Sequence, residues 1–344
     1  MARKKQSSFK RALLVFLCIL LGLVLTLMVG ATIFVNHTLN KIQRPDASEP
    51  TLSEQQIEAI LNETEPTEEE FTGEVLEPEE IEQVEEPEIL VGEDDHIINI
   101  LLIGQDARPG EGRQRSDSMI LCTVNTEEKT LVMTSFLRDT YVKIPSWGGK
   151  NYADNRLNVC YAFGGMEMLD ECMKQNFGVV VDYNIAVNFS GFEDVVDMIG
   201  GVPIYLSSRE VPYIPGTKEG SNWLNGEQAL SYARLREIDN DFGRTNRQRK
   251  VLTALLEQVK GMGVDKMFKL VDGLIPLVST DMTNAEITKL AADILPILME
   301  LDVSTQYVPA EGAYKGAMVR GMSVLIPDME KTRQQLIDTI GGIE

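Results

Sequence analysis

Two clusters of charged residues could do chemistry. In the first, Asp106 and Arg108 follow the apolar run 97–103, and Asp117 precedes the next apolar run, 119–124. Ligand sites in α/β sheets usually lie at the carboxyl ends of strands, and one short loop could bring both carboxylates to a single point. Two carboxylates at a solvated site suit Mg²⁺, which completes its octahedron with water and phosphate oxygens. The alternative is ordinary turn chemistry, because Asp and Gly favour loops.

The second cluster is rich in arginine. It combines Arg138 and Asp139 with residues 232–249, where every basic residue between 234 and 249 is Arg. A planar guanidinium binds phosphate in a bidentate way, which the ammonium of Lys cannot do. Arg244 and Gln248 would share one face of a helix. The cluster predicts phosphate binding, although a lattice of Arg–Asp salt bridges is the alternative. Two acids in the segment could form it, Asp239 and Asp241.

Histidine and cysteine are too scarce for several other chemistries. The chain has two His and four Cys, which leaves little material for a zinc site or a disulfide scaffold. His37 lies just after the apolar run 12–35 and His96 at the end of the acidic segment, so we expect no Ser-His-Asp or Cys-His nucleophile inside the domain. Cys160 and Cys172 could form a disulfide, but buried, apolar thiols are the favoured interpretation. Catalysis would therefore depend on carboxylates, arginine and a metal ion.

Apolar runs and helix caps predict the framework that must position these clusters. The expected strands are 97–103, 119–124, 131–136 and 185–189. The expected helices are 155–163, 166–177, 190–199, 227–235, 246–261 and 287–301, with Ser190 and Asn225 as N-caps. Strands mixed with helices throughout predict an α/β fold: a single α/β/α domain with a central mixed sheet and helices on both faces.

The net charge of −21 over 344 residues is unevenly distributed. Residues 1–45 contain seven basic residues and no acid, residues 46–95 contain twenty acids and no base, and residues 96–344 contain 25 basic and 33 acidic residues. The acidic balance argues against nucleic acid as a partner. The Pro- and Glu-rich composition of residues 46–95 favours an extended spacer, with one short helix at 53–61.

Residues 12–35 form an almost unbroken apolar run of 24 residues. As a helix it would span about 36 Å, enough to cross a hydrocarbon core of roughly 30 Å. All charged residues that precede it are basic, so the N-terminus is expected in the cytoplasm and the rest outside. A cleaved signal peptide is the alternative, but the run is long for one. The expected organisation is a cytoplasmic tail (1–11), a transmembrane signal anchor (12–35), an acidic disordered linker (36–95) and an extracytoplasmic catalytic domain (96–344), in a single-pass plasma-membrane protein.

Six stretches, in this order, resemble the LytR–CpsA–Psr family of bacterial cell-envelope proteins. They are NILLIGQDAR (99–108), RSDSMILCTVN (115–125), SFLRDTYVKIP (135–145), LNVCYAFGG (157–165), VNFSGFEDVVDMIGGV (187–202) and LNGEQALSYARLREIDNDFGRTNRQRKVL (224–252). The resemblance covers essentially residues 97–341. Two departures from the family pattern, Phe136-Leu137 for Ile-Pro and Arg156-Leu157 for Lys-Ile, remove no charged site residue.

The resemblance implies a Mg²⁺-dependent phosphotransferase of a Gram-positive-type bacterium. Such an enzyme moves a glycopolymer (teichoic acid, capsule or other wall glycan) from undecaprenyl-pyrophosphate to the 6-hydroxyl of N-acetylmuramic acid in peptidoglycan. Asp106 and Asp117 match the magnesium-binding positions of the family. Its pyrophosphate-binding positions are matched by Arg108, Arg138, Arg234, Arg236, Arg244 and Gln248. The catalytic residues it implies are Arg138, Asp241 and Arg244.

A polyprenyl carrier also requires an apolar channel. We expect it between residues 155 and 202, and the available side chains are Val159, Phe163, Val187, Phe189, Val195 and Ile199, although these could equally be ordinary core. The alternative function is a non-catalytic polyprenyl-pyrophosphate-binding envelope protein with a regulatory role. Direct regulation through DNA is disfavoured, because an eleven-residue cytoplasmic tail is too short for a DNA-binding domain.

Overall fold

The computed structural model describes residues 36–44, 52–61, 74–81, 85, 87, 91, 94–105, 113–239 and 241–340. The chain divides into two units, residues 1–42 and 43–344. In the first unit, residues 36–39 form a helical turn. The expected tail (1–11) and signal anchor (12–35) lie outside the described residues. Within the described ranges, every helix is too short or too polar to span a membrane.

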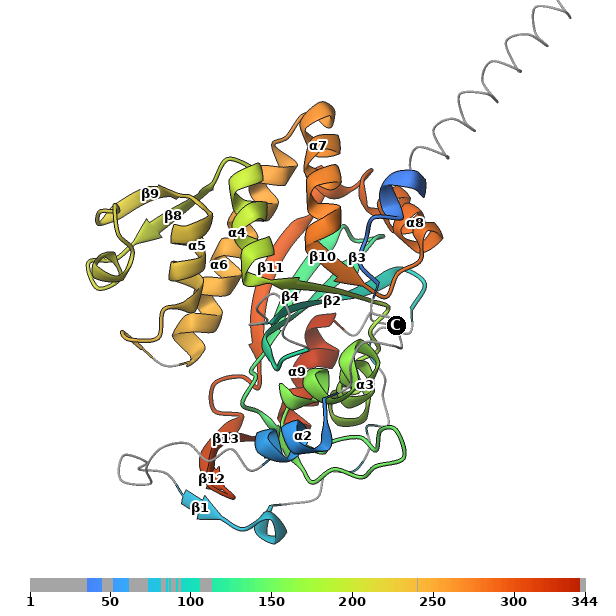
Figure 1. Cartoon of the computed structure of the whole chain (residues 1–344), viewed down its shortest axis with the longest axis vertical. Helices are drawn as coiled ribbons and strands as arrows, with labels where there is room; N and C mark the ends of the chain where they lie inside the picture. Colours follow the sequence, from blue (N-terminus) through green and yellow to red (C-terminus); the bar gives the residue numbers. More distant parts are fainter. Residues whose placement is uncertain are drawn as a thin grey trace, which may run out of the picture. The chain divides into compact units, whose positions relative to one another are not determined.

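The second unit is built on a mixed sheet of six strands in the order β10–β7–β2–β3–β4–β11 (Figure 1). The strands are β2 (Ile97–Gln105), β3 (Ser116–Asn125), β4 (Thr130–Phe136), β7 (Tyr183–Asn188), β10 (Val278–Thr280) and β11 (Asp302–Val308). β2, β3 and β4 are antiparallel neighbours, whereas β7 and β11 run parallel to β2 and β4. All four expected strands are confirmed. β10 has three residues and β11 is a largely polar edge strand, so neither has the apolar pattern of a buried strand.

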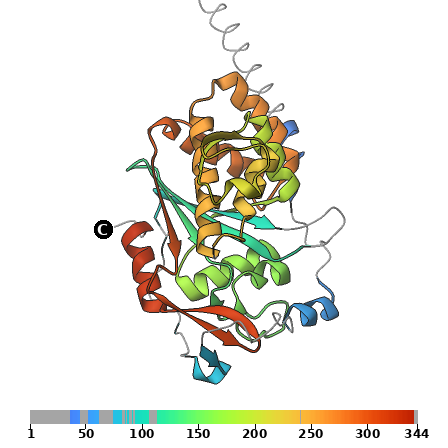
Figure 2. The same cartoon turned by 90° about the vertical axis from the view of Figure 1, so that its left-hand side faces the viewer.

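Helices cover both faces of this sheet, as predicted. Leu101 and Leu121 pack on one face with α3 (Val159–Phe177) and α9 (Met329–Ile340). Ile120 and Met133 pack on the other face with α6 (Asp241–Lys260). Neighbouring residues of a strand point to opposite faces of the sheet, so Leu121 and Ile120 belong to different cores although they are adjacent in the sequence. Figure 2 shows α3 and the α4–α7 group on opposite sides of the strands.

The α6 face also carries α4 (Phe189–Met198), α5 (Gly226–Arg234) and α7 (Val264–Leu274), with α8 (Asn284–Ile294) beyond them. Asn225 caps α5 through a reciprocal capping box with Gln228, as expected. The expected cap Ser190 is wrong. Asn188 caps α4 instead, because this residue ends β7 in an extended conformation and its side chain accepts from the Gly191 amide at 2.8 Å.

Two further expected boundaries also change. Residues 155–156 form the short strand β6, paired with β5 (Tyr141–Val142), so α3 begins only at Val159. Within α3, Gly165 has non-helical angles (φ +71°, ψ −151°) and separates two helical segments, at the break expected between residues 163 and 166. α6 starts at Asp241, five residues earlier than expected, which places the arginine-rich segment in its first turns.

Smaller sheets complete the unit. β8 (Val202–Leu206) pairs with β9 (Gly220–Leu224), and β1 (Glu74–Leu76), β12 (Tyr314–Val319) and β13 (Met322–Pro327) form a three-stranded sheet. β1 and α2 (Glu54–Leu61) belong to the segment expected to be a disordered linker. Leu52 and Val91 of that segment are in the α3-side core. The described stretches of 52–91 therefore differ from a plain spacer: they contribute folded elements to the domain.

A buried carboxylate links α3 to the sheet. The side-chain amide of Asn184 donates to Asp170 at 2.8 Å and to Asp281 at 2.7 Å. Burial raises the pKa of Asp170 from 3.8 to about 7, and the charges of Asp281 and Glu167 add to this effect, while the Asn184 hydrogen bond opposes it. The folded state therefore holds a proton that the unfolded state releases at about pH 4.

We predict that Asp170→Asn removes a pH dependence of stability. Because the folded pKa is the higher one, the free energy of unfolding of the wild type falls as the pH rises from 4 to above 7, by up to about 4 kcal/mol at 1.36 kcal/mol per pKa unit. The neutral amide of Asn does not ionise, so the variant has no cost of burying a charge. Its free energy of unfolding in urea should therefore rise relative to that of the wild type between pH 5 and 8. Glu171→Gln, an exposed neighbour on α3, is the control. Equal pH slopes for wild type and Asp170→Asn would contradict the prediction.

Candidate functional site

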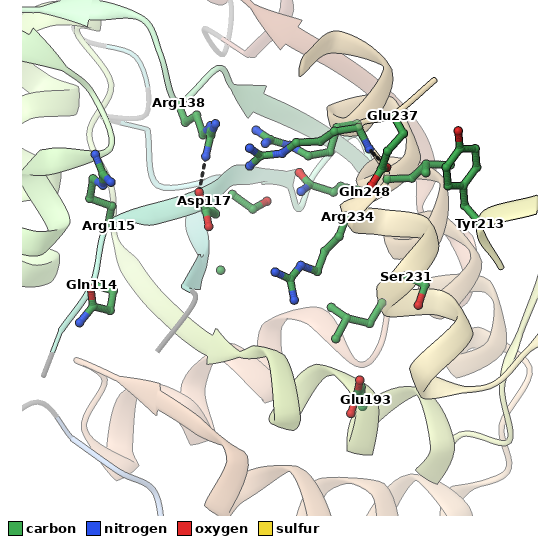
Figure 3. A pocket seen from close by; sticks show the side chains of 16 residues that line it. Gln114, Arg115, Asp117, Arg138, Glu193, Tyr213, Ser231, Arg234, Glu237 and Gln248 are labelled. Atoms are coloured by element: carbon green, nitrogen blue, oxygen red, sulfur yellow. Dashed lines mark hydrogen bonds and ion pairs between the residues drawn. The ribbon is translucent and has the colours of Figure 1, made fainter. Parts of the chain in front are cut away.

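One cavity of about 920 Å³ brings together charged residues from both sequence clusters (Figure 3). Strands β2 and β3, the end of β4, helices α4 and α5, and the start of α6 all contribute to it. Its charged lining consists of Arg115, Asp117, Arg138, Glu193, Arg234, Arg236, Glu237 and Arg244. Five arginines against three acids give the cavity a positive balance, which favours an anionic ligand.

Strand pairing brings Asp117 to Arg138. In the antiparallel β3–β4 register Met119 lies opposite Phe136, so the same register continued by two residues places Asp117 beside Arg138. The Arg138 Nη1 is 2.5 Å from the Asp117 Oδ1, and both side chains line the cavity (Figure 3). The Arg138 Nε also lies 3.4 Å from the Asp139 Oδ2. Two carboxylates therefore orient this guanidinium.

The second wall of the cavity is the turn from α5 to α6. Arg234 is the last residue of α5 and extends into the cavity, Arg236 follows in the turn, and Arg244 and Gln248 lie one helical turn apart on α6 (Figure 3). Arg244 is 3% exposed although it lines the cavity. A charge that is so deeply buried interacts strongly with any anion that enters.

A buried ion pair holds this turn in shape. Arg247, which is 3% exposed, donates to both carboxylate oxygens of Asp239 at 2.7 Å and also to the Leu235 carbonyl. The hydrogen bonds from Arg247 lower the pKa of Asp239, so the pair stays ionised. Gly243 packs against the same carboxylate, where a Cβ would lie 2.0 Å from Oδ2. For Arg247 and Asp239 the salt-bridge alternative is therefore the correct one.

Most of the expected site residues meet in this cavity. Those that line it are Asp117, Arg138, Arg234, Arg236, Arg244 and Gln248. Asp106 and Arg108 lie outside the described residues, as does the side chain of Asp241, whose backbone begins α6. The cavity also includes residues that the sequence interpretation did not assign to the site: Arg115, Glu193, Tyr213, Ser231 and Glu237. Glu193 and Ser231 occur on amphipathic helices, where polar residues usually face solvent, so only the packing of α4 against α5 identifies them.

Asp117 is the described carboxylate that fits a magnesium site. Among the residues that the structure describes, no group of three or more His, Cys, Asp or Glu side chains could bind a metal. Mg²⁺ needs only one or two protein carboxylates when substrate phosphates and waters supply the other oxygens. Asp117 lies in a cavity lined for an anion, so its surroundings fit such a shared site.

The comparisons with known proteins all indicate the same family. The model of the LytR_cpsA_psr family matches residues 56–343. A relative in Bacillus licheniformis, the polyisoprenyl-teichoic acid–peptidoglycan teichoic acid transferase TagU, is 40% identical over 178 residues, or 51% of this chain and 55% of TagU. The regulatory protein MsrR of Staphylococcus aureus is 34% identical over 223 residues, or 63% of this chain and 66% of MsrR. The chain thus spans a little over half the length of the TagU relatives that it matches.

Solved structures show the same fold. TagT bound to LI-WTA superposes with a TM-score of 0.59 and 25% identity, and covers 75% of this chain and all of the TagT chain. TagV of B. subtilis superposes with a TM-score of 0.58 and 27% identity, and covers 73% of this chain and all of the TagV chain. A mixed α/β domain with a central mixed sheet is therefore common to these proteins.

We predict that Asp239→Asn destabilises the protein by about 1–3 kcal/mol, because it leaves the Arg247 guanidinium buried without its ionic partner. The pKa of Asp239 is lowered on folding, so this contribution is present above its unfolded pKa of 3.8 and is lost as the pH falls through the folded value. Urea unfolding at pH 7 and pH 3 measures the difference. The control is Asp293→Asn, which breaks an exposed pair with Lys289. A cost as small as that of the control would show that the pair does not stabilise the turn.

Proposed function

Because this chain belongs to the LytR_cpsA_psr family, we propose that it transfers a glycopolymer from a polyprenyl-pyrophosphate carrier to peptidoglycan. The observation that carries the proposal is the cavity in which Asp117 meets Arg138, Arg234 and Arg244. The name of the TagU relative, a teichoic acid transferase, supports it. We take the donor as undecaprenyl-pyrophosphate-linked glycan and the acceptor as the 6-hydroxyl of N-acetylmuramic acid.

The proposed reaction is a phosphoryl transfer. The acceptor oxygen forms a bond to the phosphorus that carries the glycan, and the bond from that phosphorus to the bridging oxygen of the pyrophosphate breaks. Undecaprenyl phosphate leaves with the bonding electrons, and the hydroxyl proton passes to a base. Such a reaction needs alignment and neutralisation of spreading negative charge more than it needs covalent help from the protein.

The arginines supply that neutralisation. Arg138 is held by two carboxylates and Arg244 by burial, so neither must reorganise when charge develops on the phosphate oxygens. Arg234, Arg236 and Gln248 add donors from the facing wall. We assign a catalytic role to Arg138, Asp241 and Arg244, and pyrophosphate binding to Arg108 as well. Bound at Asp117 and Asp106, Mg²⁺ would add positive charge against the pyrophosphate oxygens.

The carrier tail requires an apolar path through the protein. The structure leads us to propose a different position for this path from the one expected from the sequence. Of the expected channel residues, Val159 and Phe163 are buried in the α3-side core, which the sheet separates from α6. Val195 and Ile199, in contrast, pack in a cluster with residues of α6. On the α6 side, Leu252 lies one turn beyond Gln248, and apolar side chains there are only partly buried. They include Ile98, Leu102, Cys122, Leu252, Leu256 and Val259. We propose that the tail lies along these residues, between the sheet and α6.

The properties of Cys122 support this path. Burial raises the pKa of its thiol to about 12, so protein atoms surround it. Its side chain nevertheless keeps part of its surface accessible. The thiol therefore lies among apolar side chains of the α6-side core, with part of the residue still accessible. The strand position of Cys122, with its side chain toward α6, places it on the proposed route of the tail.

The location of the protein follows from the same proposal. A donor carried on a membrane lipid and an acceptor in the wall require the catalytic domain at the outer surface of the plasma membrane. The basic residues before the apolar run 12–35 favour the same topology, with a single-pass anchor and a cytoplasmic N-terminus.

We predict that Arg138→Ala and Asp117→Asn each lower ligation at least about 100-fold, because each removes preorganised charge stabilisation worth roughly 3 kcal/mol. The measurement is release of undecaprenyl phosphate, with covalent attachment of glycan to peptidoglycan, from a purified lipid-linked donor. EDTA should abolish turnover and Mg²⁺ should restore it. Lys289→Ala, an exposed position, is the control. Tight donor binding without turnover by the wild type, with Mg²⁺ and peptidoglycan supplied, would instead support the non-catalytic regulatory alternative.

We predict that Cys122→Phe, which fills the proposed lipid path, weakens binding of undecaprenyl pyrophosphate at least about tenfold. Inorganic pyrophosphate should bind as before, since the arginines are unchanged. Cys122→Ala enlarges the space and should bind both ligands normally. Isothermal titration after a check of the unfolding temperature separates these effects, because overpacking alone costs about 1–3 kcal/mol. Normal lipid binding by folded Cys122→Phe would place the tail elsewhere.

A further inference from the structure

The first two residues of the second unit are fixed to β10 and to the start of α8. The Gln43 carbonyl accepts from the Thr280 amide at 3.0 Å. The Arg44 guanidinium donates to the Met282 carbonyl at 2.8 Å and to the Asn284 Oδ1 at 2.5 Å. These contacts fix the point at which the chain leaves the domain toward its N-terminus.

That point is close in sequence to the expected membrane anchor. Only seven residues, 36–42, separate the apolar run 12–35 from Gln43. Even a fully extended chain of seven residues reaches only about 25 Å. The surface of the domain around Gln43 is therefore the part that can reach a bilayer in which the anchor is held.

This surface is at the end of the sheet that is remote from the cavity. The cavity lies where β2 ends and β3 begins, at Gly104 and Asp117. β7 runs parallel to β2 and β10 runs antiparallel to β7, so the end of β10 points away from the cavity. Both residues that bind Arg44 follow the end of β10. β11 is parallel to β4, which ends near Arg138, so β11 begins at the same remote end.

Two exposed apolar side chains lie at this end, between α8 and β11. Ile294 and Ile297 pack into the α6-side core. Leu295 and Met299 remain outside it and are 53% and 66% exposed. α8 connects the Arg44 contact at Asn284 to Leu295 over about 16 Å. We call Leu295 and Met299 the apolar edge.

The apolar edge also adjoins the proposed lipid path. Ile294 and Ile297, its neighbours in sequence, pack in the same cluster as Leu256 and Val259 of α6. The path along α6 therefore begins at the cavity and ends beneath the apolar edge. A polyprenyl tail that follows this path would leave the protein at that edge.

The charged side chains beside the apolar edge are paired with opposite charges. Asp293 lies 3.5 Å from Lys289, and Glu300 lies 2.5 Å from Lys129. Attraction to anionic headgroups needs a surplus of basic residues, which these pairs do not supply. A lipid contact at this place would therefore depend on the apolar side chains.

We propose that Leu295 and Met299 dock the domain onto the bilayer, with both side chains inserted into the hydrocarbon below the headgroups. The inference goes beyond glycan transfer and rests on the proposed membrane anchor and lipid-linked donor. Two side chains bind a lipid surface weakly, but the anchor keeps the domain at a high effective concentration beside it. The docked domain directs its cavity away from the bilayer and places the end of the lipid path against the lipid.

The test uses the full-length chain in vesicles of phosphatidylcholine with brominated acyl chains, because bromine quenches tryptophan fluorescence only at close range. The wild type, with its two Trp residues, supplies the background. In Met299→Trp, most of the added fluorescence should be quenched. Tyr205→Trp is the matched control, since Tyr205 on β8 is 69% exposed, and its added fluorescence should not be quenched. Quenching in Met299→Trp should persist at high salt, because paired charges do not drive the contact.

A charge at the apolar edge should undo the docking. Adding Leu295→Glu to Met299→Trp should lower the ratio of docked to free domain at least about tenfold, because a carboxylate in hydrocarbon is costly. Tyr205→Glu in the same background should leave the quenching unchanged. The proposal is wrong if Met299→Trp is not quenched, if Tyr205→Trp is quenched equally, or if quenching requires anionic lipid.

Ligation separates this inference from the proposed function. If Met299→Trp is not quenched while the wild type ligates glycan from a donor in the vesicles, the docking is wrong and the proposed function stands. If Met299→Trp is quenched while the wild type ligates nothing, the docking is supported and the proposed function fails.

Discussion

Mutual repulsion of arginines is the constraint on which the rest of this structure depends. Five guanidinium groups line one cavity, and each would be more stable in bulk water than beside the others. The fold holds them with rigid elements and selected acids. Asp117 and Asp139 orient Arg138, while Asp239 pairs with Arg247 beneath the cavity wall. Positive charge is thus assembled before an anion arrives, and part of the folding free energy is converted into affinity for anions.

That arrangement explains why the site lies between strands and helices from distant parts of the sequence. The antiparallel β3–β4 pair fixes the Asp117–Arg138 contact through its register, which is set by the apolar alternation on both faces of the sheet. The α5–α6 turn is fixed by a different device, the ion pair of Asp239 with Arg247. The position of one wall is therefore set mainly by hydrophobic patterning, and that of the other by a buried ion pair.

Sequence patterns predicted the central strands and most of the arginine wall, because both have strong local signals. Buried apolar runs mark β2 to β4, and a run of Arg without Lys marks the arginine wall of the cavity. Local sequence patterns did not predict the features that depend on packing between distant parts of the chain. β11 is largely polar and lacks the apolar alternation of a buried strand. Glu193 has the sequence context of any solvent-exposed acid on a helix, yet it lines the cavity. Asn188 caps α4 in place of Ser190, because the preceding strand ends one residue earlier than expected. The expected lipid path included Val159 and Phe163, which pack in the α3-side core, because these residues are equally apolar whichever side of the sheet they pack on.

Helix α6 unites these features. Arg244 and Gln248 of α6 line the cavity. In the following turns, Leu252 and Leu256 pack against the sheet. Phe242 and Arg249 lie on the side of α6 that faces β11. Residues seven apart fall on nearly the same side of a helix, which explains why Phe242 and Arg249 both reach Tyr307. The donor that we propose combines an apolar tail with a pyrophosphate. One helix that offers an apolar and a cationic side can align both with a single rigid element, so a small rotation of α6 would misplace both parts at once.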